Sequence, residues 1–185
     1  HYGVPLRVLS VTPTRDGLNS PSRRLKDKHA RLFHGRTLDE WCMVQMWSSK
    51  CVAKQVFVCE TKEHAARLMP LAEQYNVELV VRPPDMLHPV NDTGGLPIRW
   101  GVDHALAEAR KTGEWYGLIT TPFVVSPCRK PGLYDALHAA YIERVNNPDY
   151  QSTYPCLVAM APNPQGWFWQ NQGGDSPVKM VVGNT

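Results

Sequence analysis

The stretch RVLSVTPTRDG, residues 7–17, contains the transition on which the predicted fold depends. Its first half is a run of apolar and β-branched residues that ends at Pro13, a composition typical of a buried β-strand. Its second half, from Thr14 onward, consists of polar, charged and turn-forming residues. We therefore predict a buried strand over residues 7–13 and a loop that begins at Thr14.

Strand and helix patterns alternate along the rest of the chain. Thr37 and Thr61 each stand as an N-cap before a helical run, and Glu40 completes a capping box with Thr37. The predicted strands cover residues 7–13, 55–60, 77–82, 115–123 and 154–162, and the predicted helices cover residues 37–50, 61–75, 98–113 and 130–147; two short β-like pieces follow within residues 163–185. This order predicts right-handed βαβ crossovers. The expected fold class is α/β, a three-layer α/β/α sandwich with a mostly parallel sheet, formed as a single domain over residues 1–185.

The loop after the first strand concentrates positive charge. Between Thr14 and Arg36, seven basic residues stand against two acidic ones, a local net charge of +5 in a chain whose formal net charge is +3. Ligands of parallel sheets bind beyond the carboxyl ends of the strands, where this loop and the loops after Arg82 and Thr121 are expected to meet. Charge confined to one loop predicts a small anionic partner and no nucleic acid. A solvated basic loop without a ligand is the alternative interpretation.

The residue types of this loop suit phosphate. The loop lacks both G-x-x-x-x-G-K-[ST] and G-x-G-x-x-G, which excludes a P-loop nucleoside triphosphatase and disfavours a dinucleotide site. Small residues let backbone amides approach phosphate oxygens, and arginine supplies paired planar donors. The loop offers Arg15 directly after the strand, then the small residues Gly17, Ser20 and Ser22, and then spaced cations.

The composition bears on the partners, the cysteine chemistry and the location of the protein. No stretch approaches 18 consecutive apolar residues, so we expect no membrane partner. The five cysteines are widely spaced and form no C-x-x-C pair, which argues against a zinc site or a disulfide framework. Free thiols fit a reducing compartment, and the expected location is cytoplasmic.

Several motifs together resemble those of a known enzyme family. TPTRDG…KHARLFHGRTLDEW is similar to the opening of the acylneuraminate cytidylyltransferases (CMP-sialic acid synthetases) and their 3-deoxy-manno-octulosonate relatives. Pro13-Thr14-Arg15 stands where those proteins have P-A-R, and residues 28–38 match their block K-N-I-K-P-L-x-G-K-P-L, with Gly35 retained and His29 in place of asparagine. Downstream, NDTGG resembles S-D-T-A-S-S and ITTPF resembles Q-P-T-S-P-L. In order and spacing, the resemblance extends over about residues 7–171.

The resemblance implies a nucleotide-diphosphosugar transferase fold and a cytidylyltransferase reaction. CTP would be coupled to a sialic-acid-like sugar acid with release of pyrophosphate, Mg²⁺ would be the cofactor, and the protein would form a homodimer. Arg15 and Lys28 would bind the triphosphate and assist catalysis, and Arg23 or Arg24 would help them. Cations that neutralise charge on the departing pyrophosphate suit this chemistry, and no covalent intermediate is needed.

Two more residues match family motifs but also have ordinary structural interpretations. Arg82 matches the arginine of an R-P motif near the nucleotide, and it can equally be a strand-end arginine paired with a neighbouring acid. Asp92 matches the acid of S-D-T, and it can equally cap a helix. Asp103 and His104 are neighbours on a predicted helix and point about 100° apart, so we expect no acid–base pair there.

Other positions depart from the family pattern. Gly94-Gly95 replaces two serines, and the carboxylates that hold Mg²⁺ in the family's C-terminal segment have no counterpart that we can assign. The metal ligands are therefore unassigned, and part of the usual domain is expected to be short or missing. A second interpretation follows, a catalytically inactive or divergent nucleotide-binding module of the same fold. The cluster Trp167-Phe168-Trp169 is expected in a core or a subunit interface.

Overall fold

The computed structural model describes residues 7–16, 28–87, 95–125, 127–147, 149, 167–170 and 179–182. The chain divides into two compact units, His1–Leu133 and Tyr134–Thr185, and each is described by itself. The expectation of a single domain stays a prediction. No helix among the described residues is long and apolar enough to cross a membrane.

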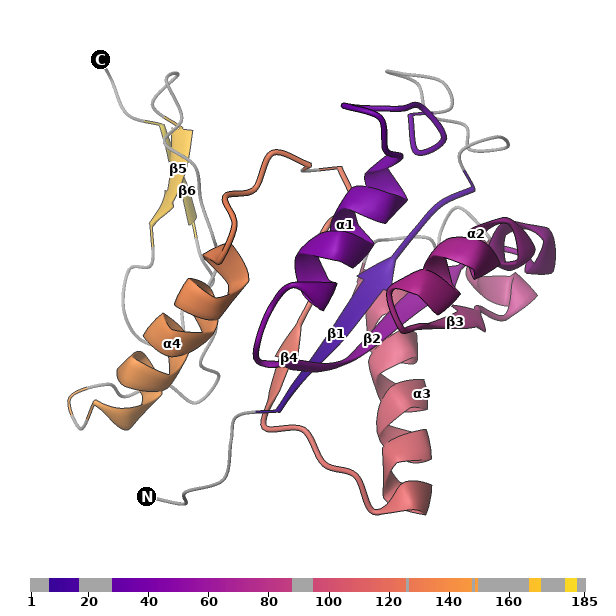
Figure 1. Ribbon diagram of the computed structural model, residues 1–185. Coiled ribbons are helices and arrows are strands. Elements are labelled where there is room, and N and C mark those ends of the chain that lie inside the picture. The colour runs from indigo at the N-terminus through magenta and orange to yellow at the C-terminus, as the bar shows by residue number, and fades with distance from the viewer. Residues whose placement is uncertain are drawn as a thin grey trace. The chain divides into compact units, whose positions relative to one another are not determined.

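The first unit contains a four-stranded parallel sheet (Figure 1). Its strands are β1 (Val8–Pro13), β2 (Val52–Cys59), β3 (Val77–Val81) and β4 (Leu118–Thr120), in the spatial order β3-β2-β1-β4. Strand β1 pairs in parallel with both β2 and β4, so Val8 lies opposite Val52 on one side and Leu118 on the other. Along the chain, the strands therefore add outward from β1 to β2 and β3, and the chain then returns to place β4 on the other side of β1. Such a reversal creates a crevice at the carboxyl ends of the strands.

Helices cover both faces of this sheet, which confirms the expected α/β/α sandwich. Side chains on one face of β1 and β2 pack against α3 (Gly95–Thr112), and those on the opposite face of β2 pack against α1 (Leu38–Trp47) and α2 (Lys62–Gln74). The alternation is clearest in β2, where Val56 and Val58 face α3 while Phe57 and Cys59 face the other layer. Successive strand residues point to opposite faces, and here both faces are apolar because both are covered.

Both predicted helix caps are present. The Thr37 hydroxyl accepts a hydrogen bond from the Glu40 backbone N–H at 3.2 Å, and the Thr61 hydroxyl accepts one from the His64 backbone N–H at 3.1 Å. Each bond satisfies a backbone donor that the first turn of a helix would leave without a partner. These local signals correctly place the starts of α1 and α2.

Several element boundaries differ from the sequence prediction; strand β2, for example, begins at Val52 rather than at residue 55. Strand β4 has three residues rather than nine, and Pro122, which has no backbone N–H to donate, follows its end closely. Helix α3 begins at Gly95 rather than at residue 98, and Pro97 lies in its first turn, where a missing N–H does no harm. A 3-10 helix (Pro84–Leu87) follows β3.

The second unit contains a helix and a hairpin-like pair of strands. Helix α4 (Leu133–Asn146) matches the last predicted helix. Strands β5 (Trp167–Gln170) and β6 (Lys179–Val182) pair antiparallel, and they correspond to the two predicted β-like pieces. The predicted strand over residues 154–162 lies outside the described residues, as do the side chains of the cluster Trp167-Phe168-Trp169.

We expect Gly101→Ala to destabilise the first unit. A Cβ atom at Gly101 of α3 would lie 2.4 Å from Val58 Cγ2 and 2.9 Å from Val11 Cγ1, so the helix or the sheet must move. Overpacking of this kind costs about 1–3 kcal/mol, against a gain in helix propensity of about 1 kcal/mol. Urea unfolding monitored by circular dichroism measures the change. A stabilised Gly101→Ala variant would contradict the close helix–sheet approach, and Ala107→Gly, at an exposed position of α3, calibrates the propensity effect.

Candidate functional site

A pocket of about 170 Å³ opens at the carboxyl ends of the strands. Its walls come from the segment after β1, from the end of β3, from the loop after β4 and from the first turn of α3. The described lining residues are Pro13, Thr14, Arg15, Lys28, His29, Arg82, Pro97, Phe123, Val124 and Val125. The pocket therefore lies where the strand order reverses at β1, the position expected for a ligand in an open parallel sheet.

Three cations predicted from the sequence share this pocket. Arg15 follows β1, Lys28 lies further along the same connection, and Arg82 directly follows β3. No Asp or Glu is among the described residues that line the pocket. Positive charge in a concave site favours an anionic ligand. Nucleotide binding by Arg15, Lys28 and Arg82 stays a prediction.

The remaining candidate residues cannot be placed beside them. Gly17, Ser20, Ser22, Arg23, Arg24 and Asp92 lie outside the described residues. Their proposed contacts with the nucleotide therefore stay predictions as well.

Arg82 is buried and bound to an acidic neighbour. One of its terminal nitrogens, Nη2, lies 2.8 Å from Glu60 Oε1, and its backbone N–H donates to the Cys59 carbonyl at 3.1 Å. The alternative interpretation, a strand-end arginine paired with a neighbouring acid, therefore describes its local contact. Arg82 nevertheless lines the pocket, so the ion pair holds a cation in a fixed position at the wall.

Glu60 connects this arginine to a second buried acid. Its Oε2 accepts a hydrogen bond from the Asp16 backbone N–H at 2.6 Å, and the Asp16 carboxylate forms an ion pair with Arg67 of α2. Asp16 is buried, whereas Arg67 is partly exposed. The carboxyl ends of β1, β2 and β3 are thus joined by charged hydrogen bonds behind the pocket. Sequence reasoning missed Glu60, although its position at the end of a predicted strand was a usable signal.

A second buried polar group lies behind Thr14 and His29 of the pocket wall. The Thr14 hydroxyl donates a hydrogen bond to Asp39 Oδ1, and His29 Nδ1 lies 3.8 Å from the same oxygen. All three side chains are buried. Asp39 is in the first turn of α1, where the helix dipole favours an acidic residue.

A tight turn sets the course of the chain between His29 and α1. Phe33 and Arg36 exchange two backbone hydrogen bonds, at 2.7 and 3.3 Å, and His34 and Gly35 between them have φ angles of 49° and 79°. Two residues with positive φ are typical of a type I′ turn, and glycine adopts this conformation without strain. The Arg36 guanidinium lies over the Trp41 ring at 5.0 Å, which anchors the turn on α1.

The apolar part of the pocket comes from the loop after β4. Phe123 and Val125 are half exposed, at 55% and 50%, while Val124 is buried in the core. Arg129 holds this loop against α1, because it donates to the Phe123 carbonyl and to Gln45 Oε1. A cationic wall and an apolar wall in one pocket suit a ligand with both a phosphate chain and a ring.

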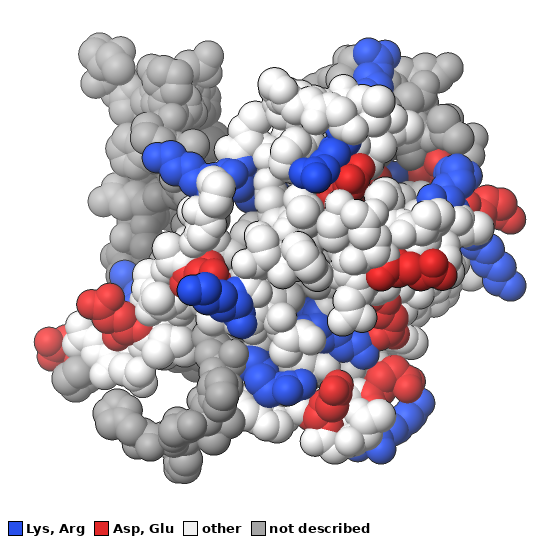
Figure 2. Space-filling view, in the orientation of Figure 1, with Lys and Arg blue, Asp and Glu red and all other residues white. Residues whose placement is uncertain are grey.

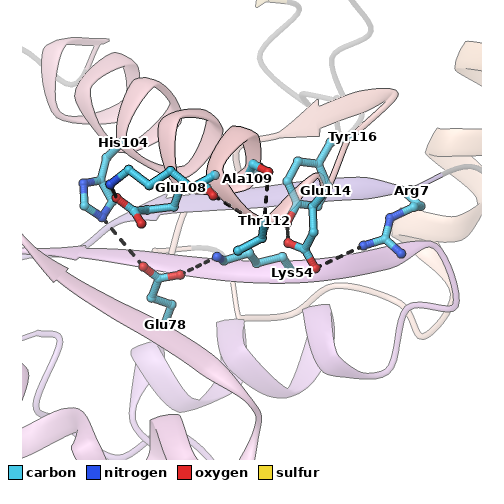
Figure 3. Close-up of polar contacts among 10 residues, drawn as sticks. Arg7, Lys54, Glu78, His104, Glu108, Ala109, Thr112, Glu114 and Tyr116 are labelled. Atoms are coloured by element: carbon cyan, nitrogen blue, oxygen red, sulfur yellow. Dashed lines mark hydrogen bonds and ion pairs between the residues drawn. The ribbon is translucent and has the colours of Figure 1, made fainter.

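Asp103 and His104 lie apart from this site and have different partners. His104 Nε2 is 3.7 Å from Glu78 Oε1, whose carboxylate also binds Lys54, as Figure 3 shows. Asp103 is 3.8 Å from Arg99 on its own helix. Lys54 and Glu78 belong to the first residues of β2 and β3, at the end of the sheet opposite the pocket. The two side chains do not converge, as the sequence predicted.

Charges elsewhere on the surface are mixed. On the face shown in Figure 2, Lys and Arg side chains are interspersed with Asp and Glu side chains. The pocket differs from that surface because its described lining contains cations without acids.

Comparison with known proteins bears on the fold. Neither a protein-family model nor a curated protein sequence matches the chain. Among solved structures, it is similar to a CMP:2-keto-3-deoxy-manno-octonic acid synthetase complexed with CTP, with 14% identity and a TM-score of 0.50 over 76% of this chain and 49% of that one. At this identity the likeness establishes a shared fold.

Two further structures are similar at lower scores. A cytidylyltransferase from Leptospira borgpetersenii serovar Hardjo-bovis (strain JB197) has 14% identity and a TM-score of 0.47, over 77% of this chain and 50% of that one. A 4-diphosphocytidyl-2C-methyl-D-erythritol synthase has 13% identity and a TM-score of 0.49, over 78% and 57%. The chain thus spans about half the length of these proteins.

We expect the stability of the first unit to fall below neutral pH through His64. Burial lowers the pKa of this histidine from its ordinary value of 6.5, and nearby Asp39, Asp16 and Glu60 only partly oppose the effect. Because the folded pKa lies below the unfolded one, the unfolded state takes up more protons as the pH falls below about 6.5. The free energy of unfolding then decreases by up to about 1.4 kcal/mol per pH unit for this one group.

His64→Gln tests this expectation through a slope rather than an absolute stability. Urea unfolding at several pH values between about 5 and 7 compares the two proteins over the range in which histidine titrates. The variant should lose stability less steeply as the pH falls. Equal slopes would show that His64 is not the buried neutral group that the structure describes.

Proposed function

We propose that this chain is the nucleotide-binding part of a cytidylyltransferase-type nucleotidyltransferase. The observation that carries the proposal is the convergence of Arg15, Lys28 and Arg82 on one pocket at the carboxyl ends of the strands. The substrates would be CTP and a sialic-acid-like sugar acid, and the products a CMP-sugar and pyrophosphate. The choice of base and of sugar acid rests on the sequence motifs that resemble the acylneuraminate family, as does the homodimer. The proposed cytoplasmic location rests on the free thiols expected from the cysteine spacing.

The geometry of the cations suits phosphoryl transfer. A hydroxyl of the sugar acid attacks the α-phosphorus of CTP, a new P–O bond forms, and the bond to the bridging oxygen breaks so that pyrophosphate leaves. Negative charge accumulates on the departing group, and in this proposal Arg15 and Lys28 neutralise it. Arg82 is held by Glu60, so its guanidinium needs little reorganisation when the phosphates arrive.

Mg²⁺ is part of the proposal as a cofactor without assigned ligands. The buried acids behind the pocket are already engaged: Asp16 with Arg67, Glu60 with Arg82, and Asp39 with Thr14. These three acids therefore do not fit a magnesium site, since Mg²⁺ requires oxygen ligands that can turn toward it. No step above depends on the metal.

A nucleotide-binding module without catalysis is the second candidate. The engagement of Asp16, Glu60 and Asp39 favours it, because a pocket whose described lining contains cations and no carboxylate can bind a nucleotide and fail to turn it over. Both candidates predict nucleotide binding, and only the first predicts pyrophosphate release.

Pyrophosphate release separates the two candidates. The protein is mixed with Mg²⁺, each of the four nucleoside triphosphates and a panel of eight- and nine-carbon sugar acids. We expect release with CTP and one class of sugar acid, because the cations stabilise the departing group. If CTP raises the melting temperature but no pair of nucleotide and sugar acid releases pyrophosphate, the result supports the second candidate, the nucleotide-binding module. If no nucleotide raises the melting temperature, both candidates fail.

We expect Arg15→Ala to weaken CTP binding by about ten- to a hundredfold. A hydrogen bond to a charged group contributes about 1.5–3 kcal/mol, and each 1.4 kcal/mol corresponds to a factor of ten. Isothermal titration calorimetry with CTP measures the loss. Arg99→Ala is the matched control, because Arg99 is an exposed arginine of α3 that does not line the pocket. Unchanged CTP affinity in Arg15→Ala would remove Arg15 from the site.

A further inference from the structure

His29 occupies an unusual position in the pocket wall. It lines the pocket beside Lys28, and its side chain is only 4% exposed. Its Nδ1 is buried and makes no hydrogen bond within the described residues, and the Asp39 carboxylate is 3.8 Å away. Since Nδ1 is turned toward Asp39, Nε2 is the ring nitrogen that remains for a ligand in the pocket.

The carboxylate itself is held in place. Asp39 is 5% exposed, and its Oδ1 already accepts the hydroxyl hydrogen of Thr14. Helix α1 begins at Leu38, so the Asp39 backbone belongs to a capped first turn. The imidazole thus has an acceptor of fixed position on its Nδ1 side.

The chemistry of imidazole then determines what can bind at Nε2. A neutral imidazole donates from one nitrogen and accepts at the other, whereas the protonated ring donates from both. Phosphate oxygens accept hydrogen bonds, and so does Asp39. If Nδ1 donates to Asp39 while Nε2 donates to a phosphate oxygen, the ring must therefore be protonated.

Other charged groups surround the histidine and act in opposite directions. Arg15 after β1, Lys28 beside it and Arg82 after β3 share the pocket and oppose a further positive charge. Asp39 of α1 favours that charge. A triphosphate in the pocket neutralises the three cations and adds a second favourable partner.

We propose that His29 is a phosphate-binding residue of this pocket, that Asp39 orients it, and that the ring takes up a proton when the triphosphate binds. This inference rests on the proposed function, since it assumes a triphosphate in the pocket. The family that the sequence resembles commonly has asparagine at this position, and an asparagine cannot take up a proton.

Proton uptake on binding is the direct test. Calorimetric titrations of the protein with CTP, each in two buffers of different ionisation enthalpy, give the number of protons bound at each pH between about 6 and 8.5, the range in which histidine exchanges its proton. The same titrations are carried out with His29→Gln, in which the glutamine amide keeps a neutral donor near the position of Nε2. Ionisation of CTP contributes equally to the proton uptake of both proteins. The difference between the two proteins isolates His29.

We expect the wild-type protein to take up about half a proton more than His29→Gln at the pH of greatest difference. By linkage, this corresponds to an affinity ratio between wild type and variant that is about tenfold larger at pH 6 than at pH 8.5. His104→Gln, at the other end of the sheet, should behave as the wild type. Asp39→Asn, which can still accept from Thr14, should reduce the uptake.

The possible failures are distinguishable. If wild type and His29→Gln bind CTP with equal proton uptake at every pH, the inference is wrong while the nucleotide site stands. If the wild-type protein binds neither CTP nor inorganic triphosphate, both the proposed function and the inference are wrong. The comparison of wild type with His29→Gln does not depend on whether Asp39→Asn folds.

Discussion

The double pairing of β1 is the constraint on which the site depends. Because β1 lies between β2 and β4, the loops that leave β1 and β4 must diverge at their carboxyl ends, and a crevice opens between them. Arg15, after β1, and Phe123, after β4, both line this crevice. The apolar contacts between α3 and β1, including the close approach at Gly101, keep this pair of strands in place.

Buried acids give the pocket its electrostatic character. A cation that lines a partly buried pocket loses hydration, and this loss is tolerable only where a carboxylate compensates for it. Glu60 does so for Arg82, and the Asp16 backbone and carboxylate connect Glu60 to Arg67. The acids that hold these arginines do not line the pocket, whereas Arg15, Lys28 and Arg82 do, so the described lining of the pocket is positively charged.

Local sequence signals predicted most of the framework. The caps at Thr37 and Thr61 and the apolar run before Pro13 depend on neighbours within a few residues, and the structure agrees with each. The beginning of β4 was predicted less well, because a strand extends only as far as its partner can pair with it. The first residue of β4, Leu118, pairs with Val8, the first residue of β1, which is more than 100 residues distant in the sequence.

The sequence by itself determined the α/β class, the parallel sheet and the concentration of cations after β1, since periodicity, capping and charge are written in consecutive residues. Only the tertiary structure decided which side chains meet. Nothing near Asp39 in the sequence indicates that it faces His29, and nothing near Glu60 indicates that it holds Arg82 while accepting the Asp16 backbone N–H. The physical reason is that parallel strands bring distant loops to one edge, so a site built there is assembled from segments with no local relation to one another.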